Sequence, residues 1–173
     1  SPGGRDVRYR ALWGFFSWLH KRGYVAVNPF AGKDKLVERP RLPKRVLPHH
    51  TPEQLATLIA NAPTTRDRAL VSLFADSGAR LNEVLNIKLE DINWQDREVK
   101  VLGKGAKERY IPFGETTEKV LKEHLASHTP NGNIWGLTRN GVHTMLRRLE
   151  ARTSIPCNPH SFRRTFAITL RDR

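Results

Sequence analysis

The spacing of apolar positions changes along the chain and divides it into segments. Over residues 5–22, apolar and aromatic side chains recur at helical spacing, and Gly23 stands where such a helix would end. Residues 28–48 lose this periodicity and contain four prolines and six lysines or arginines, which is typical of an extended linker. We therefore predict three parts, namely residues 1–28, a basic linker over residues 29–50 and a second module over residues 51–173.

The second module begins with Thr51-Pro52-Glu53-Gln54, which combines an N-cap, a proline in the first turn and the glutamine of a capping box. Apolar residues then recur mostly at helical spacing. The expected helices cover residues 52–60, 65–77, 81–87, 115–127, 140–152 and 160–173. Their clearest apolar faces are Leu70, Leu73 and Phe74 in the second helix, which Gly78 ends, and Phe162, Phe166 and Leu170 in the last.

Residues 91–113 follow a different pattern, in which apolar and polar positions alternate. Polar turns at residues 95–97 and 103–106 separate three β-prone segments. This arrangement predicts a small three-stranded antiparallel meander. The second module is therefore expected to be α+β, a mostly helical domain with a small sheet inserted early.

The charge is unevenly placed. The chain carries a formal net charge of +13, and its middle is close to neutral. Residues 1–50 hold 11 basic and 3 acidic groups, residues 51–137 hold 11 and 12, and residues 138–173 hold 8 and 2. Two basic ends would attract a polyanion from two sides, although a basic solvated surface is the simpler alternative. An anionic membrane is a weaker alternative, because the cations do not gather on one amphipathic helix.

Composition excludes several classes of protein. A hydrophobic fraction of 38% is enough for a core and argues against disorder. No apolar run approaches the ~18 residues of a membrane span, and no signal peptide is visible. The single cysteine permits no internal disulfide, which fits a reducing compartment. His124 and His128 lack the order of a metalloprotease helix, so we interpret them as a solvated helix face and predict no metal site.

Three clusters carry candidate chemistry. In residues 103–109, two glycines allow a tight turn and Lys104 projects from the tip of a hairpin, within reach of a phosphate. Arg80 follows the glycine stop at the next junction, and Glu83 lies one turn on and can orient its guanidinium. His160 and Arg163 share the first turn of the last helix, where the helix dipole also favours an anion.

Each cluster also has an ordinary interpretation, namely a charged hairpin tip, a local ion pair and a solvated helical histidine. In this order and at these separations, however, they resemble the characteristic blocks of the tyrosine recombinases, the family of phage integrases and Xer-type recombinases. The matching segments are residues 77–92, 103–112 and 160–167. The helix over residues 5–22, followed by Asn28-Pro29, resembles the last helix of the family's core-binding domain.

This resemblance implies site-specific DNA strand exchange through a 3′-phosphotyrosyl intermediate, without metal or cofactor. Arg80 and Arg163 would neutralise the phosphate oxygens, with Glu83 orienting Arg80. Lys104 would protonate the leaving 5′-oxygen, and His160 would hydrogen-bond the phosphate or assist proton transfer. The cations expected to contact DNA are Lys44, Arg45, Lys107, Arg109, Arg139, Arg147, Arg148 and Arg164.

The main departure of the chain from the family pattern concerns the nucleophile. The family places a second His or Trp, and then the nucleophilic tyrosine, several tens of residues beyond the His-x-x-Arg block. Tyr9, Tyr24 and Tyr110 all lie upstream of that block. We therefore expect a piece of a longer recombinase that lacks the nucleophile and binds double-stranded DNA without cleaving it.

The resemblance also implies partners and a location. The parent would act with sister protomers in a tetrameric synapse on DNA, in the cytoplasm at the nucleoid, with no membrane partner. This chain is expected to be mostly monomeric without DNA. Two other functions stay open: a non-catalytic DNA-binding or regulatory protein that retains the integrase fold, and an RNA-binding module, although the chain shows no aromatic signature of an RRM or KH domain.

Overall fold

The computed structural model describes residues 2–33, 35–41, 47, 49–103, 105, 107–127, 130 and 132–172. The chain forms two compact units, residues 1–46 and residues 47–173. Within these ranges, no helix is long and apolar enough to cross a membrane.

The first unit consists of helix α1 (Pro2–Lys21) and the segment that follows it. Gly23 adopts a φ of +78°, and the Tyr24 N–H donates to the Leu19 carbonyl, so the helix ends where the sequence predicts. Phe30 returns to pack against Tyr9 and Phe16, with both ring centroids 5.4 Å away. Five apolar side chains of this helix stay about half exposed in the unit, namely Val7, Leu12, Trp13, Phe15 and Trp18.

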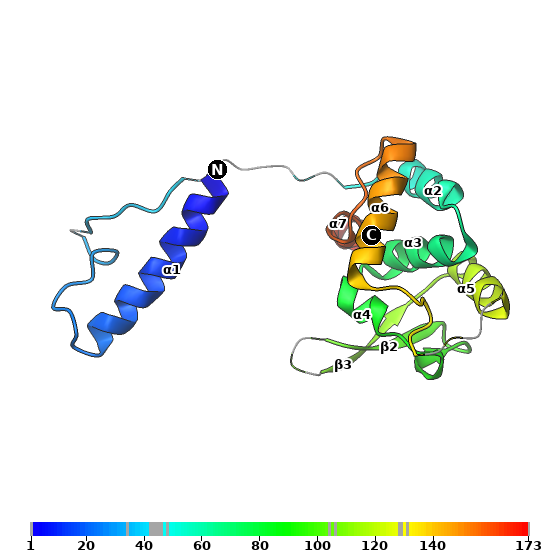
Figure 1. The fold of residues 1–173 in the computed structure, drawn as a ribbon, viewed down its shortest axis with the longest axis horizontal. Helices are drawn as coiled ribbons and strands as arrows, with labels where there is room; N and C mark the ends of the chain where they lie inside the picture. The colour runs from blue at the N-terminus through cyan, green and yellow to red at the C-terminus, as the bar shows by residue number, and fades with distance from the viewer. Residues whose placement is uncertain are drawn as a thin grey trace. The chain divides into compact units, whose positions relative to one another are not determined.

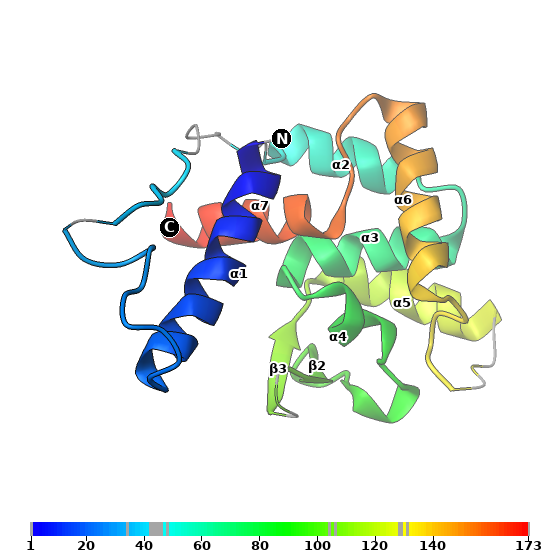
Figure 2. The same ribbon diagram turned by 60° about the vertical axis from the view of Figure 1, so that its left-hand side comes forward.

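The second unit is built around α3 (Thr65–Ser77), which packs against α2 (Pro52–Asn61), α5 (Glu115–Ser127) and α7 (Pro159–Arg171). Figures 1 and 2 show α3 lying between α5 and α7. Leu70, Leu73 and Phe74 are fully buried in α3, which confirms its predicted apolar face. The ring of Phe74 stacks on Phe162 of α7 with centroids 5.9 Å apart.

Helix α6 (Arg139–Thr153) packs against α2 and α4 (Leu81–Leu85). Trp135, which precedes α6, is buried and its Nε1–H donates to the Val84 carbonyl at 2.7 Å. The Val84 carbonyl also accepts from the Ile87 N–H at 3.3 Å, so the indole of Trp135 adds a second hydrogen bond at the end of α4.

The predicted sheet is present. A 3₁₀ turn η1 (Leu89–Asp91) leads into β1 (Ile92–Asn93), and β2 (Glu98–Leu102) and β3 (Glu108–Pro112) follow. The strands form one antiparallel sheet in the order β1-β2-β3. Val99 and Ile111 face each other across β2 and β3 and are fully buried. The predicted α+β class, mostly helical with a three-stranded antiparallel sheet, is therefore confirmed.

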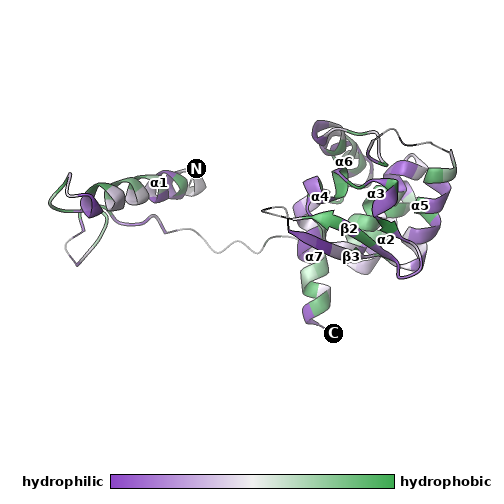
Figure 3. Cartoon of the chain, turned by 90° about the horizontal axis from the view of Figure 1, so that it is seen from below, coloured by the Kyte–Doolittle hydropathy of each residue, from purple (hydrophilic) through white to green (hydrophobic). Residues whose placement is uncertain are grey.

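Two details of the prediction are wrong. Leu170 does not belong to the buried face of α7, since it is 56% exposed. Figure 3 explains this exposure, since the last turns of α7 project from the rest of the unit. His124 is not on a solvated face, because it is buried, its ring bonds the Ile134 carbonyl at 2.8 Å, and it stacks on Trp135. His128 lies outside the described residues.

Candidate active site

A cavity of about 290 Å³ lies where the α3–α4 junction meets α6 and α7. Its described lining contains three arginines, two histidines and no acidic residue, so it suits an anion. The lining residues are Ala79, Arg80, Leu81, Asn82, Arg139, His143, Pro159, His160 and Arg163. The predicted residues Arg80, His160 and Arg163 come from distant parts of the sequence and line one cavity, together with Arg139.

Gly78 allows α7 to approach this junction closely. Its φ is +53°, and a Cβ built on it would lie only 2.8 Å from the Phe166 side chain. Both the backbone conformation and the lack of space therefore require glycine. At this close approach the Arg163 Nη1 donates to the Gly78 carbonyl at 2.9 Å, which anchors one end of that guanidinium.

Arg80 is anchored by a carboxylate. It stands at the N-cap of α4 in an extended conformation. Glu83 Oε2 accepts from the Arg80 backbone N–H at 2.8 Å, and Glu83 Oε1 accepts from Arg80 Nη1 at 2.9 Å. The Glu83 side chain is 3% exposed and that of Arg80 is 55% exposed, so a buried anion holds a cation that reaches solvent.

Glu83 has a second cationic partner. Arg109 Nη2 donates to Glu83 Oε2 at 2.7 Å. Burial raises the pKa of Glu83, but the hydrogen bond from Arg109, the hydrogen bonds from Arg80 and the charge of Arg109 together lower this pKa to about 2. The carboxylate is therefore ionised throughout the neutral range.

The first turn of α7 holds His160 and Arg163. The Asn158 side chain caps the helix by accepting from the Ser161 N–H at 3.0 Å, and Pro159 fills the first helical position. This start places His160 and Arg163 three residues apart on one face, as the sequence predicts, and both side chains line the cavity. The dipole of α7 adds to the preference for an anion at this end of the helix.

Helix α6 contributes two side chains, Arg139 and His143. Sequence reasoning included Arg139 among the DNA contacts but missed His143. Part of the signal was present, because Arg139 directly precedes the predicted helix over residues 140–152 and is four positions from His143, a spacing that places two residues on one helix face. Thr138 caps this helix by accepting from the Gly141 N–H at 3.1 Å.

The other predicted residues lie elsewhere. Lys44, Arg45 and Lys104 fall outside the described residues. Five described cations do not line the cavity: Lys107, Arg147 and Arg148 are exposed, Arg164 is half-buried on α7, and Arg109 is paired with Glu83. Tyr110 lies on β3 and is 59% exposed, and no tyrosine is among the described lining residues.

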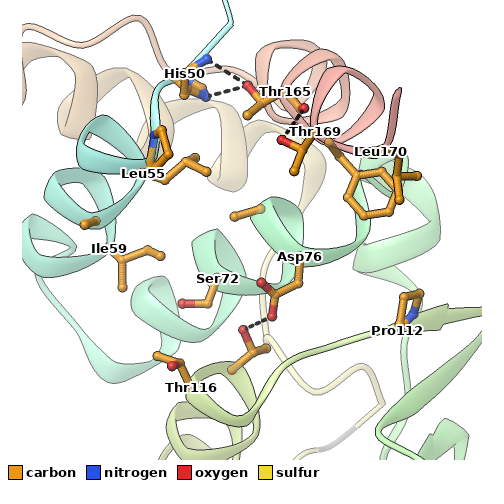
Figure 4. A pocket seen from close by; sticks show the side chains of 15 residues that line it. His50, Leu55, Ile59, Ser72, Asp76, Pro112, Thr116, Thr165, Thr169 and Leu170 are labelled. Atoms are coloured by element: carbon orange, nitrogen blue, oxygen red, sulfur yellow. Dashed lines mark hydrogen bonds between the residues drawn. The ribbon is translucent and has the colours of Figure 1, made fainter. Parts of the chain in front are cut away.

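A second cavity, of about 600 Å³, lies between α2, α3, α5 and α7 (Figure 4). Its described lining is largely apolar and includes the carboxylate of Asp76 but no lysine or arginine. At its edge, His50 is buried and its backbone N–H donates to Thr165 Oγ1 at 2.8 Å, while burial lowers the pKa of His50. This cavity is larger than the first but lacks the charge to bind a phosphate.

Residues 48–173 match the model of the phage integrase family. The chain belongs to this family. One relative is the tyrosine recombinase XerC of Proteus mirabilis. It is 29% identical to this chain over 182 residues, and the match covers 98% of this chain. XerC of Xylella fastidiosa (strain M23) is 33% identical over 180 residues and covers 94% of this chain. These matches confirm the predicted resemblance to tyrosine recombinases.

Solved structures of other proteins have a similar fold. The crystal structure of XerH site-specific recombinase bound to difH substrate matches 99% of this chain and 55% of that chain, with a TM-score of 0.68 and 20% sequence identity. At 20% sequence identity, this match shows the fold alone. The chain spans 59% of the length of the two XerC relatives.

Proposed function

We propose that the second unit binds the phosphodiester of duplex DNA in the arginine-lined cavity and belongs to a site-specific recombinase. The observation that carries this proposal is the pair Arg80 and Arg163. Among the described residues, each guanidinium is hydrogen-bonded to the protein through Nη1 alone, which leaves its other N–H groups for phosphate oxygens. The relatives named tyrosine recombinases, and a structural neighbour described as bound to its difH substrate, support this choice of ligand.

The chemistry of the proposed reaction fits these residues. A tyrosine oxygen attacks the phosphorus, a 3′-phosphotyrosyl bond forms, and the bond to the 5′-oxygen breaks. Arg80 and Arg163 stabilise the charge that develops on the non-bridging oxygens, and Glu83 orients Arg80. Lys104 gives a proton to the leaving 5′-oxygen, and His160 hydrogen-bonds the phosphate or assists that transfer.

The nucleophile is the missing group. Tyr9 and Tyr24 belong to the first unit, and Tyr110 does not line the cavity. We propose that the tyrosine belongs to sequence outside these 173 residues, and that this chain binds DNA without cleaving it. Residues 1–28 would belong to a core-binding domain, residues 29–50 would form its linker, and sister protomers would join on DNA.

One other function is compatible with the same cavity. A DNA-binding or regulatory protein with the same cavity and no nucleophile would bind DNA in the same way, and the described lining, which holds no tyrosine, fits both functions. The two functions differ in the parent protein, because only a recombinase becomes covalently attached to a nicked suicide substrate. A denaturant-resistant adduct with the full-length parent supports the recombinase, and its absence supports the binding protein.

The DNA-binding proposal is tested with this chain and a fluorescein-labelled duplex. The double variant Arg80→Met and Arg163→Met is expected to bind about 100-fold more weakly, because two charge-assisted contacts are lost. Affinity of the unmodified chain should fall steeply with salt. Arg97→Met, which removes a cation paired with Glu118 and outside the cavity lining, is the control. Equal affinity of the double variant and the control contradicts the proposal.

A further inference from the structure

Arg109 reaches the active-site region from the sheet. It lies on β3, where its Cα pairs with that of Val101 on β2, and its side chain is 39% exposed. Arg109 Nη2 is 2.7 Å from Glu83 Oε2, and its Nε makes a longer contact of 3.5 Å with Glu83 Oε1. The planar fork of Arg109 therefore grips both oxygens of a carboxylate that is 3% exposed.

The same two oxygens hold Arg80. Oε2 accepts from the Arg80 backbone N–H, and Oε1 accepts from Arg80 Nη1. A carboxylate with four partner groups from two arginines has a defined orientation, since rotation about its last bond would lose several charge-assisted hydrogen bonds. Glu83 thus links Arg109, outside the cavity lining, to Arg80 within it.

The base of the β2–β3 hairpin adjoins this link. A Cβ built on Gly103 would lie 3.7 Å from Glu83 Oε1, and the Gly103 N–H donates to the Lys107 carbonyl at 2.8 Å. Glu83 therefore lies beside the backbone of the hairpin as well as beside two arginines. This arrangement fixes the position of α4 relative to the two strands.

We propose that Arg109 is a positioning residue, which holds Glu83 so that the guanidinium of Arg80 stays aimed at the phosphate. This inference rests on the proposed function, in which Arg80 binds that phosphate. It gives Arg109 a different role from the direct DNA contact that its charge suggests. Without Arg109, Glu83 keeps Arg80 as its main partner and can draw the guanidinium toward itself and away from the ligand.

A double-mutant cycle tests the proposal with the 173-residue chain and a labelled duplex. Arg109→Met should weaken DNA binding about 5-fold in the unmodified chain and less than about 2-fold in the Arg80→Met background, because its effect passes through Arg80. If Arg109 contacts DNA itself, its loss costs the same in both backgrounds and lowers the salt slope by about one. That additive result overturns the proposal, and so does an Arg109→Met variant that binds normally.

The control is Arg97→Met. Arg97 is 43% exposed and pairs with Glu118 at 2.8 Å, so its loss removes the same charge and a comparable ion pair at a place that does not line the cavity. Its small effect should be equal in both backgrounds. A different result would contradict the proposed function itself. If Arg80 does not bind the DNA phosphate, Arg80→Met alone leaves DNA affinity unchanged.

A conservative variant covers the case in which Arg109→Met does not fold, as judged by its thermal unfolding. Arg109→Lys keeps the charge but replaces the fork by a single donor. It should bind DNA about 2-fold more weakly than the unmodified chain and lose this difference in the Arg80→Met background. An Arg109→Lys effect that persists in that background overturns the proposal.

Discussion

The two arginines of the cavity are held in different ways. Arg80 is anchored by Glu83, a buried carboxylate that itself needs two cations. Arg163 is anchored by a backbone carbonyl, at a place where Gly78 lets two helices meet. The anchor of Arg80 depends on the charge of Glu83, and the anchor of Arg163 depends on the close approach of α7 that Gly78 allows. Substitutions at the two anchors should therefore damage the protein for different reasons and by different amounts.

The largest effect is expected from Gly78→Ala. The new methyl group would meet Phe166 at 2.8 Å, and the residue would keep a φ of +53°. We expect a loss of about 3 kcal/mol or more in the free energy of unfolding, measured by thermal or chemical denaturation. Gly105→Ala is the matched control, because Gly105 has a φ of +76° but nothing within 4 Å, and it should cost about 1 kcal/mol. Equal losses would show that contact with Phe166 is not what requires glycine.

Glu83→Gln comes next. It keeps the shape of the side chain but leaves Arg80 and Arg109 without their shared buried anion. The expected loss is about 2 to 3 kcal/mol in the free energy of unfolding. Glu118→Gln removes a more exposed carboxylate that pairs with Arg97 and Lys122, and should lower the free energy of unfolding much less. Similar losses for both variants would show that the buried ion pairs of Glu83 stabilise the fold no more than exposed ones do.

The same carboxylate predicts a dependence of stability on pH. The pKa of Glu83 is about 2 in the folded chain and 4.5 in its ordinary state, so its contribution is complete above about pH 4.5 and is lost as the pH falls toward 2. The contribution is on the order of 3 kcal/mol. Unfolding measured between pH 6 and about 3 should show a smaller loss of stability in Glu83→Gln than in the unmodified chain. Identical pH profiles would show that Glu83 has no lowered pKa.

Arg163→Met should have the smallest effect on stability. The variant removes one hydrogen bond to the Gly78 carbonyl and leaves the close contact of the two helices in place. We expect a loss of about 1 kcal/mol in unfolding free energy, together with about 10-fold weaker DNA binding. A large loss of stability with little change in DNA affinity would make Arg163 a structural residue.

The sequence predicts what depends on neighbours in the chain. The helix start at Thr51 and the stop at Gly78 are local patterns, and the structure has both. The spacing of Arg80 and Glu83 by three residues was enough to predict their ion pair. Lys104, the remaining candidate, lies outside the described residues.

Contacts between distant segments could not be predicted in this way. Arg109 is 26 positions from Glu83, and Arg163 is 85 positions from Gly78. No periodicity within one element shows which side chain of another element will meet it. The burial of His124 was missed for the same reason, since its partner Trp135 follows in a separate segment.

The central claim is that Arg80 and Arg163 bind a DNA phosphate together. The most direct measurement follows the Nε–Hε signals of the arginine side chains by NMR during titration with a duplex. The account predicts that the signals of Arg80 and Arg163 shift together and strongly, while that of Arg97 moves little. Shifts confined to arginines that do not line the cavity, with Arg80 and Arg163 unchanged, would contradict it.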